Sequence, residues 1–178
     1  LYYDKKGDAH YDTVSAFIKS MRGSDPNATL HYLARMIKAG EDPKFIARRM
    51  VIFASEDIGN ARPNALVLAV TCMQAVAMIG MPESQLILSQ TACYLACCPK
   101  SIASTTGIYE AMSDINMDNL GPIPLHLRNA PTRLMKDFGY GKGHVRYAWK
   151  VEKETGRKVD QKYLPENLKD RKYYHIDF

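Results

Sequence analysis

The chain has 178 residues, of which 46% are apolar and 24% are charged, and its formal net charge is +5. These values are typical of one soluble globular domain, or of one domain with a tail. No stretch of about 20 residues is apolar throughout and no signal peptide opens the sequence, so it predicts neither a membrane-spanning helix nor an export signal. The first residue is Leu rather than Met, and we expect a piece of a longer protein.

The net charge is concentrated at the C-terminal end. Residues 1–131 contain twelve Lys or Arg and twelve Asp or Glu, whereas residues 132–178 contain twelve and seven. Between residues 63 and 127 only five side chains are charged. The sequence therefore predicts a middle part that is buried or faces another subunit, and a tail with an electrostatic role.

Helical periodicity accounts for most of the first 115 residues. The dipeptides Asp25-Pro26 and Asp42-Pro43 each predict an N-cap followed by a proline in the first helical turn. The predicted helices are residues 13–21 with Asp12 as N-cap, 26–39, 44–57, 64–79, 82–99, 100–115 and a short final helix within 131–140. Only short segments such as "HVRYAW" alternate like a strand, so the predicted fold class is all-α.

The helix predicted for residues 64–79 is apolar on almost every side. It contains no charged residue, and the helix after it contains only Glu83. Such helices lie in the centre of a bundle or between subunits. The candidate core or interface residues are Ala65, Leu66, Val70, Met73, Met78 and Leu86, and the sequence does not separate the two roles.

Two segments share features with nucleotide-binding motifs. "FGYGKGH" places Lys142 between glycines, but a P-loop requires Ser or Thr where Gly143 stands, and an earlier glycine that is missing here. "VIFASED" has the order of a Walker B strand, but its spacing is helical, which places Glu56 and Asp57 at a helix end. The sequence therefore predicts no catalytic residue and no nucleotide-binding residue in this chain.

The cysteines favour reduced, buried thiols over a metal site. Cys93 and Cys97 are one helical turn apart, but a structural zinc needs four ligands, and no His lies in either cysteine-containing helix. The other two cysteines are Cys72 and Cys98. The five histidines are scattered, without a partner nucleophile. We predict neither a metal nor a cofactor on this chain.

Basic and aromatic residues are interleaved in the last part of the chain. The aromatic residues indicate a tail that lies on the bundle, because disordered segments are poor in them. Lys and Arg neutralise phosphates and aromatic rings stack on unpaired bases, so DNA binding is the alternative to a solvated surface. The candidate DNA-binding residues are Lys136, Lys142, Arg146, Lys150, Arg157 and Lys158, with Arg22, Arg48 and Arg49 as further candidates.

Several long segments together resemble a known family. They are "HYDTVSAFIKSMRGSDP", "YLARMIKAGEDPKFIARRMVIFASEDIG", "YLACCPKS", "LRNAPTRLMKDFGYGKGH" and "QKYLPENL". They resemble the C-terminal region of the replication-associated recombination protein A family, whose eukaryotic relative is the Werner helicase-interacting ATPase. The resemblance runs from about residue 3 to about residue 174, and the chain departs from the family pattern at Trp149-Lys150 and in "DRKYYHI".

This resemblance implies an all-helical domain, related to the collar of clamp-loader subunits, that joins subunits into tetramers. The whole proteins of the family are AAA+ DNA-dependent ATPases that act at stalled or damaged replication forks. The resemblance implies that ATP and Mg²⁺ bind to an ATPase module outside this chain, so that the chain itself is not an enzyme.

The resemblance also implies a division of the chain and a set of partners. We expect residues 1–11 to end the lid of the ATPase module, residues 12–138 to form the oligomerisation domain, and residues 139–178 to form an extended basic tail packed on it. The expected partners are further copies of the chain, DNA, and replication-fork proteins such as single-stranded DNA-binding protein, in the cytoplasm at the nucleoid. The alternative function is a DNA-binding helical module that uses the tail.

Overall fold

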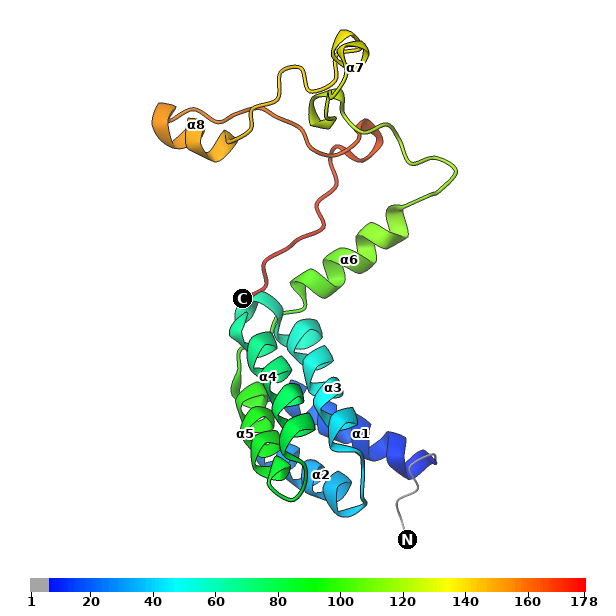
Figure 1. Cartoon of the computed structure of the whole chain (residues 1–178), viewed down its shortest axis with the longest axis vertical. Coiled ribbons are helices and arrows are strands. Elements are labelled where there is room, and N and C mark those ends of the chain that lie inside the picture. The colour runs from blue at the N-terminus through cyan, green and yellow to red at the C-terminus, as the bar shows by residue number, and fades with distance from the viewer. Residues whose placement is uncertain (1–6) are drawn as a thin grey trace. The chain divides into compact units, whose positions relative to one another are not determined.

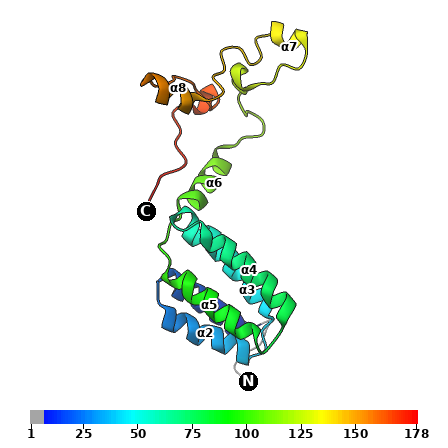
Figure 2. The same ribbon diagram turned by 60° about the vertical axis from the view of Figure 1, so that its left-hand side comes forward.

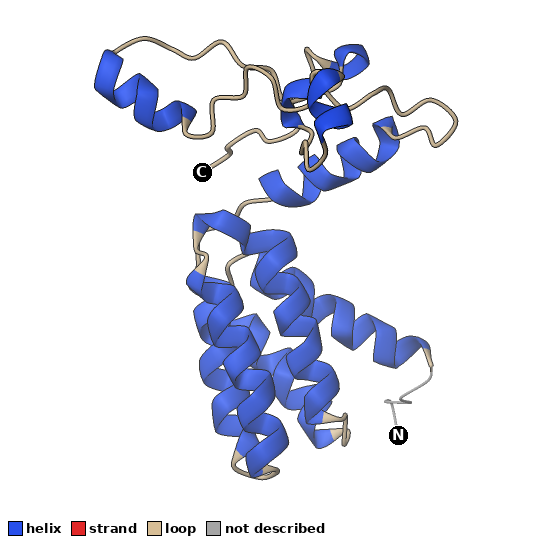
Figure 3. Cartoon of the chain, turned by 45° about the horizontal axis from the view of Figure 1, so that its top comes forward, coloured by secondary structure: helices blue, strands red, loops and turns tan. Residues whose placement is uncertain are grey.

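The computed structural model describes residues 7–178, and within this range the chain forms eight α-helices and no β-strand (Figures 1 and 3). The α-helices are α1 (Asp8–Arg22), α2 (Pro26–Lys38), α3 (Pro43–Phe53), α4 (Asn64–Ile79), α5 (Ser84–Cys97), α6 (Ala103–Asp114), α7 (Arg133–Asp137) and α8 (Ala148–Thr155). Short π- or 3-10-helical turns are η1 (Ala54–Ile58), η2 (Gly59–Ala61), η3 (Leu125–Leu127) and η4 (Glu166–Leu168). The prediction of an all-α fold is confirmed.

The chain divides into two compact units. The bundle unit comprises the residues up to Ala111 together with Tyr173–Phe178, and the 112–172 unit comprises Met112–Lys172. α7 therefore belongs to the same unit as α8, whereas the sequence grouped α7 with the bundle. The functional segments expected at 1–11, 12–138 and 139–178 stay predictions, and residues 1–6 lie outside the described part of the chain.

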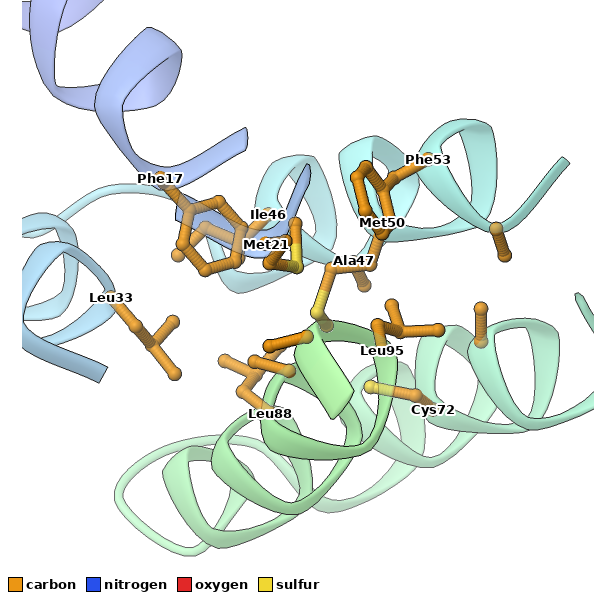
Figure 4. Packing of buried hydrophobic residues seen from close by; sticks show 14 of the residues in the cluster. Phe17, Met21, Leu33, Ile46, Ala47, Met50, Phe53, Cys72, Leu88 and Leu95 are labelled. Atoms are coloured by element: carbon orange, nitrogen blue, oxygen red, sulfur yellow. The ribbon is translucent and has the colours of Figure 1, made fainter. Parts of the chain in front are cut away.

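Five helices enclose the core of the bundle unit. α1 packs on α2 and α5. α3 packs on α4 and α5, and α5 also contacts α2 and α4 (Figure 2). Figure 4 shows Phe17 and Met21 of α1 facing Met50 of α3 and the side chains of Leu88 and Leu95 from α5. Removal of these apolar side chains from water contributes roughly 25 cal/mol per Å² and is the main force that holds the helices together.

Capping residues set the starts of α2 and α3. The Asp25 carboxylate accepts a hydrogen bond of 2.9 Å from the backbone N–H of Ala28, and Pro26 follows in the first turn. The Asp42 carboxylate accepts one of 2.9 Å from the N–H of Lys44. Both predicted helix starts are confirmed, because each cap satisfies an N–H that has no partner inside its helix.

The predicted start of the first helix at Asp12 is wrong. α1 already begins at Asp8, and Asp12 lies inside it. The earlier turn of α1 buries a polar residue: His10 Nδ1 lies 2.9 Å from a carboxylate oxygen of Glu41. The apolar stripe of α1 begins only after this first turn, so a prediction from apolar residues alone starts the helix one turn too late.

The boundaries of the later helices agree in part with the sequence. α4 spans the predicted residues 64–79, whereas α5 is shorter than predicted at both ends. The helix predicted for 44–57 ends as α3 at Phe53 and continues as the π-helical turn η1. The helix predicted as the last one is α7, and α8 follows it, so that prediction was wrong about the end of the helical part.

The last six residues of the chain belong to the bundle unit. The carboxylate of Asp177 accepts hydrogen bonds from the hydroxyl of Ser101 and from the backbone N–H of Ile102. These bonds lower the pKa of the Asp177 carboxyl below its ordinary value. The end of the chain is thus attached beside the start of α6.

Candidate functional site

One side of α4 is covered by the rest of the bundle unit. Its buried residues recur at intervals of three and four along the helix and face α3 and α5. They are Ala65, Ala69, Cys72 and Val76. These residues are small, so α4 approaches its neighbours closely.

The remaining surface of α4 is open to solvent and mostly apolar, with Asn64, Thr71 and Gln74 as its exposed polar residues. Met78 is 84% exposed, Val67 is 59% exposed and Ile79 is 55% exposed. We call the exposed large residues Leu66, Val67, Leu68, Met78 and Ile79 the α4 outer face. No charged residue occurs between Arg62 and Glu83, so this face carries no ionic side chain of its own. An apolar surface without charge is typical of a protein–protein contact rather than of a solvated helix.

The six candidate core or interface residues separate into three groups by burial. Ala65 is fully buried, whereas Val70 and Met73 are half-buried. Leu66 and Met78 lie on the α4 outer face, and Leu86 is exposed on α5. Leu86 lines a groove of about 310 Å³ with Leu30, Leu33 and Ile37 of α2, and Met78 is not part of that lining.

A second apolar groove lies between α3 and α6. Its volume is about 560 Å³, and its lining includes Ile52 of α3 and both Ile108 and Tyr109 of α6. The hydroxyl of Thr105 donates a hydrogen bond of 2.9 Å to the carbonyl oxygen of Glu56 and so fixes α6 beside η1. The bundle unit therefore exposes apolar side chains on α6 as well as on α4.

Asp57, one of the two carboxylates that suggested a Walker B strand, has a structural role. Asp57 lies in the π-helical turn η1, where its side chain is 7% exposed, and Arg22 Nε donates to it at 2.8 Å. This hydrogen bond raises the pKa of the Arg22 guanidinium above its ordinary value. Arg22, one of the further DNA candidates, is therefore paired inside the bundle unit. Of the other two candidates, Arg48 is exposed and Arg49 has a buried Nε atom.

Three of the four thiols, those of Cys72, Cys93 and Cys98, are weakened as nucleophiles by burial. All four are free, and burial raises the pKa of Cys72, Cys93 and Cys98. Because the thiolate is the reactive form, a raised pKa lowers thiol reactivity at neutral pH. Within residues 7–178 no three His, Cys, Asp or Glu side chains converge as a metal site would require.

The glycine-rich segment after α7 is a series of turns. Gly139, Gly141 and Gly143 all have positive φ. The N–H of Gly141 donates to the carbonyl oxygen of Leu125 at 2.8 Å, so it is not directed at a ligand. In the described chain no strand leads into this segment, and no hydroxyl follows Lys142. The segment therefore does not fit the phosphates of ATP.

The six candidate DNA-binding residues all lie in the 112–172 unit with exposed side chains. Four of them, Arg146, Lys150, Arg157 and Lys158, flank or belong to α8, whereas Lys136 lies on α7 and Lys142 in the turns after it. Figures 1 and 2 both show α7 and α8 apart within this unit. In residues 7–178 the only ion pair of these six is the exposed one of Lys150 with Glu154 at 3.9 Å. The cations are thus free to meet phosphates, most densely around α8.

Tyr147, Trp149 and Lys153 lie in the segment where basic and aromatic residues are interleaved, but they are not among the candidate site residues predicted from the sequence. The structure brings them together with Lys150 and Glu154 around a shallow pocket of about 560 Å³. The signal that could have selected them is the position of the two aromatic residues at the start of a charged helix.

Comparison with known proteins identifies similar chains along nearly the whole length. The model of the MgsA AAA+ ATPase C-terminal family matches residues 23–177. An uncharacterized AAA domain-containing protein of Mycobacterium tuberculosis is 52% identical over 172 residues, which are 97% of this chain and 37% of that protein. Replication-associated recombination protein A of Coxiella burnetii is 46% identical over 97% of this chain and 38% of its own length.

A eukaryotic protein is similar as well. The ATPase WRNIP1 of Dictyostelium discoideum is 44% identical over 98% of this chain and 20% of its own length. The chain therefore spans about two fifths or less of these relatives. Within residues 7–178 no helix has the length and apolarity needed to cross a membrane.

Proposed function

The chain belongs to the MgsA AAA+ ATPase C-terminal family, and on that premise we propose that it joins the subunits of a AAA+ ATPase into a homotetramer. The relatives named replication-associated recombination protein A support a role of the whole protein in replication-associated recombination and repair, at stalled forks. In this proposal ATP and Mg²⁺ bind to an ATPase module outside the chain, and the chain contributes assembly rather than chemistry.

The α4 outer face is the observation that carries this proposal. An isolated subunit would leave the exposed apolar side chains of α4 in water. Contact with a second copy removes this surface from water at roughly 25 cal/mol per Å², without burying an ionic side chain of α4. Symmetry repeats the same face on every subunit.

Light scattering of the chain at tens of micromolar tests the proposal. The expected mass is four times the 20.1 kDa of one chain. Val67→Glu and Met78→Glu are expected to reduce the mass, because each would place a charge in the contact. Tyr11→Glu is the matched control: Tyr11 is 68% exposed on α1, away from the α4 outer face, and its replacement should leave the mass unchanged.

Two outcomes would reject the proposal. One is a strict monomer of the unchanged chain at these concentrations. The other is an oligomer that neither α4 substitution weakens, which would place the contact elsewhere. Circular dichroism of each variant keeps loss of assembly distinct from loss of the helical fold.

Binding of DNA by the 112–172 unit is the second candidate function, favoured by the exposed basic residues around α8. The expected affinity for single-stranded and forked DNA falls steeply as salt rises, because each neutralised phosphate releases counterions. Replacement of Arg157 and Lys158 by Ala should flatten that salt dependence. Absent binding, or binding that does not respond to salt, would contradict this candidate. For the whole protein we propose a location in the cytoplasm at the nucleoid, and replication-fork proteins such as single-stranded DNA-binding protein as partners.

A further inference from the structure

The start of α8 exposes two neighbouring aromatic rings. Tyr147 is 50% exposed and Trp149 is 66% exposed. Their ring centroids are 6.5 Å apart and the planes are inclined by 66°, so the rings meet edge to face. Lys150, Lys153 and Glu154 complete the lining of the pocket that opens beside them. An exposed indole leaves a large apolar ring surface in water, and a stacking partner would remove that surface from solvent.

Hydrogen bonds on both sides of Tyr147 and Trp149 fix the backbone that carries these rings. The side-chain amide of Gln161 accepts a hydrogen bond from the N–H of Val145 at 2.8 Å and donates one to its carbonyl oxygen at 3.2 Å. The Glu152 carboxylate accepts a hydrogen bond of 3.0 Å from the N–H of Val159, which connects α8 to the segment that follows it. The helix ends at Thr155, and Gly156 after it has the left-handed conformation. These hydrogen bonds restrict the segment that carries the rings. Because the segment is already ordered, binding a ligand costs less conformational entropy.

The charge around the rings is positive. Residues 142–158 contain six Lys or Arg and two Asp or Glu. One of the acidic residues, Glu152, is engaged by the backbone, and the other, Glu154, forms only a long exposed pair with Lys150. The Arg146 guanidinium carbon lies 5.2 Å from the centre of the Tyr147 ring, so a cation borders the aromatic surface directly. Phosphates complement this charge.

We propose that Tyr147 and Trp149 form a stacking platform for the unpaired bases of a single-stranded nucleic acid, while Arg146, Lys150 and Lys153 contact its phosphates. Bases offer their faces to a protein ring only when they are not stacked inside a duplex, so the platform selects single strands. The combination of rings and cations favours this ligand over an acidic peptide, which would use the cations but not the rings. The inference rests on the DNA-binding candidate above and is independent of oligomerisation.

The platform contains the only tryptophan of the chain, so the tryptophan fluorescence reports on this site alone. Stacking of a base on Trp149 should quench the tryptophan fluorescence of the full chain. The probes are a dT oligonucleotide of about 16 nucleotides, an abasic oligomer with the same number of phosphates, and a blunt duplex. The dT oligomer should quench strongly, whereas the abasic oligomer and the duplex should not. Comparison with an rU oligomer shows whether the platform prefers single-stranded DNA or single-stranded RNA. Quenching by the dT or by the rU oligomer supports the platform.

Variants add an independent readout, the anisotropy of a labelled dT oligomer. Trp149→Ala should weaken binding by about tenfold, Trp149→Phe should restore most of the affinity, and Tyr147→Ala should weaken it similarly. Phe138→Ala is the matched control, because Phe138 is also 66% exposed in the same unit but does not line the pocket. Light scattering of each variant should show unchanged assembly.

Different results would reject the stacking platform and the DNA-binding function of the 112–172 unit. If dT and abasic oligomers bind equally and leave the fluorescence unchanged, the platform is rejected while electrostatic DNA binding stands. If no oligomer binds, both are rejected. If the fluorescence changes with protein concentration alone, a second copy of the chain covers Trp149, and the platform is again rejected.

Discussion

The ion pair of Arg22 and Asp57 is a single contact that joins α1 to the turn after α3. Arg22 donates from Nε and Nη2 to the two carboxylate oxygens at 2.8 and 3.4 Å. Asp57→Asn removes the charge but keeps the size, and it should lower the free energy of unfolding by about 2 kcal/mol, the typical contribution of a charged hydrogen bond. Arg22→Met should cost more, about 3 kcal/mol, because it leaves the buried carboxylate without its cation.

Urea denaturation of these variants measures both changes. Arg48→Met is the control, because Arg48 is exposed on the neighbouring helix, and it should change the stability by less than about 0.5 kcal/mol. An Asp57→Asn variant as stable as the unchanged chain would show that the pair contributes nothing.

Asp177 gives the attachment of the chain end a pH dependence. Its pKa is lowered, first by the Ser101 hydroxyl and then by the Ile102 N–H. A carboxyl whose pKa is lowered in the folded state stabilises that state above its unfolded pKa, near 3.9, and the contribution is lost as the pH falls through the lowered value. The protection of residues 173–178 against hydrogen exchange, relative to the intrinsic rate at each pH, should therefore be higher at pH 6 than at pH 3. Asp177→Asn should abolish that pH-dependent difference, and protection that does not change between these pH values would contradict the assignment.

At the scale of elements, Gly107 lies in α6 where the end of the chain passes close to the helix. A Cβ atom at this position would lie 2.9 Å from the carbonyl oxygen of Tyr173. Gly→Ala in a helix usually gains about 1 kcal/mol, but here the methyl group would push the returning segment away. Gly107→Ala should therefore fail to raise the stability in urea and should increase hydrogen exchange of residues 173–178. Thr106→Ala, one residue away and exposed, is the control that should leave this exchange unchanged.

The helices that could be predicted from the sequence are those with one side buried in the core. α2 and α3 have an Asp-Pro start and an apolar stripe, and α4 is bounded by Pro63 and Gly80, so caps and periodicity agree. α8 has no buried residue, and only Ala148, Trp149 and Val151 of its eight residues are apolar. Helical periodicity reports burial rather than helicity, and for this reason it missed α8.

The candidate surfaces could be predicted only in part, for a related reason. The absence of charge on α4 indicated that the helix is buried or in contact, but a helix that is apolar all round does not show which side faces its own core. The structure assigns Ala65 to the core and Met78 to the surface. The basic residues were recognisable by type, whereas the pairing of Tyr147 with Trp149 depends on a helix that the sequence did not indicate.

At the scale of the whole molecule, assembly and stability are linked by mass action. If the folded chain associates through the α4 outer face and the unfolded chain does not, higher protein concentration favours the folded state. The melting temperature of the unchanged chain should then rise by a few degrees for each tenfold increase in concentration. Scanning calorimetry over a hundredfold range measures this slope.

The concentration dependence of the melting temperature of the Met78→Glu variant tests whether the α4 outer face is the contact. Met78 is 84% exposed in the single chain, so the substitution should cost little stability in a monomer. In the oligomer it would bury an unpaired carboxylate, which favours dissociation. The variant should therefore melt near the temperature of the unchanged chain at the lowest concentration and fall progressively below it as concentration rises. Parallel melting curves at all concentrations would mean that Met78 stays in water in the assembled protein, and that the α4 outer face is not the contact.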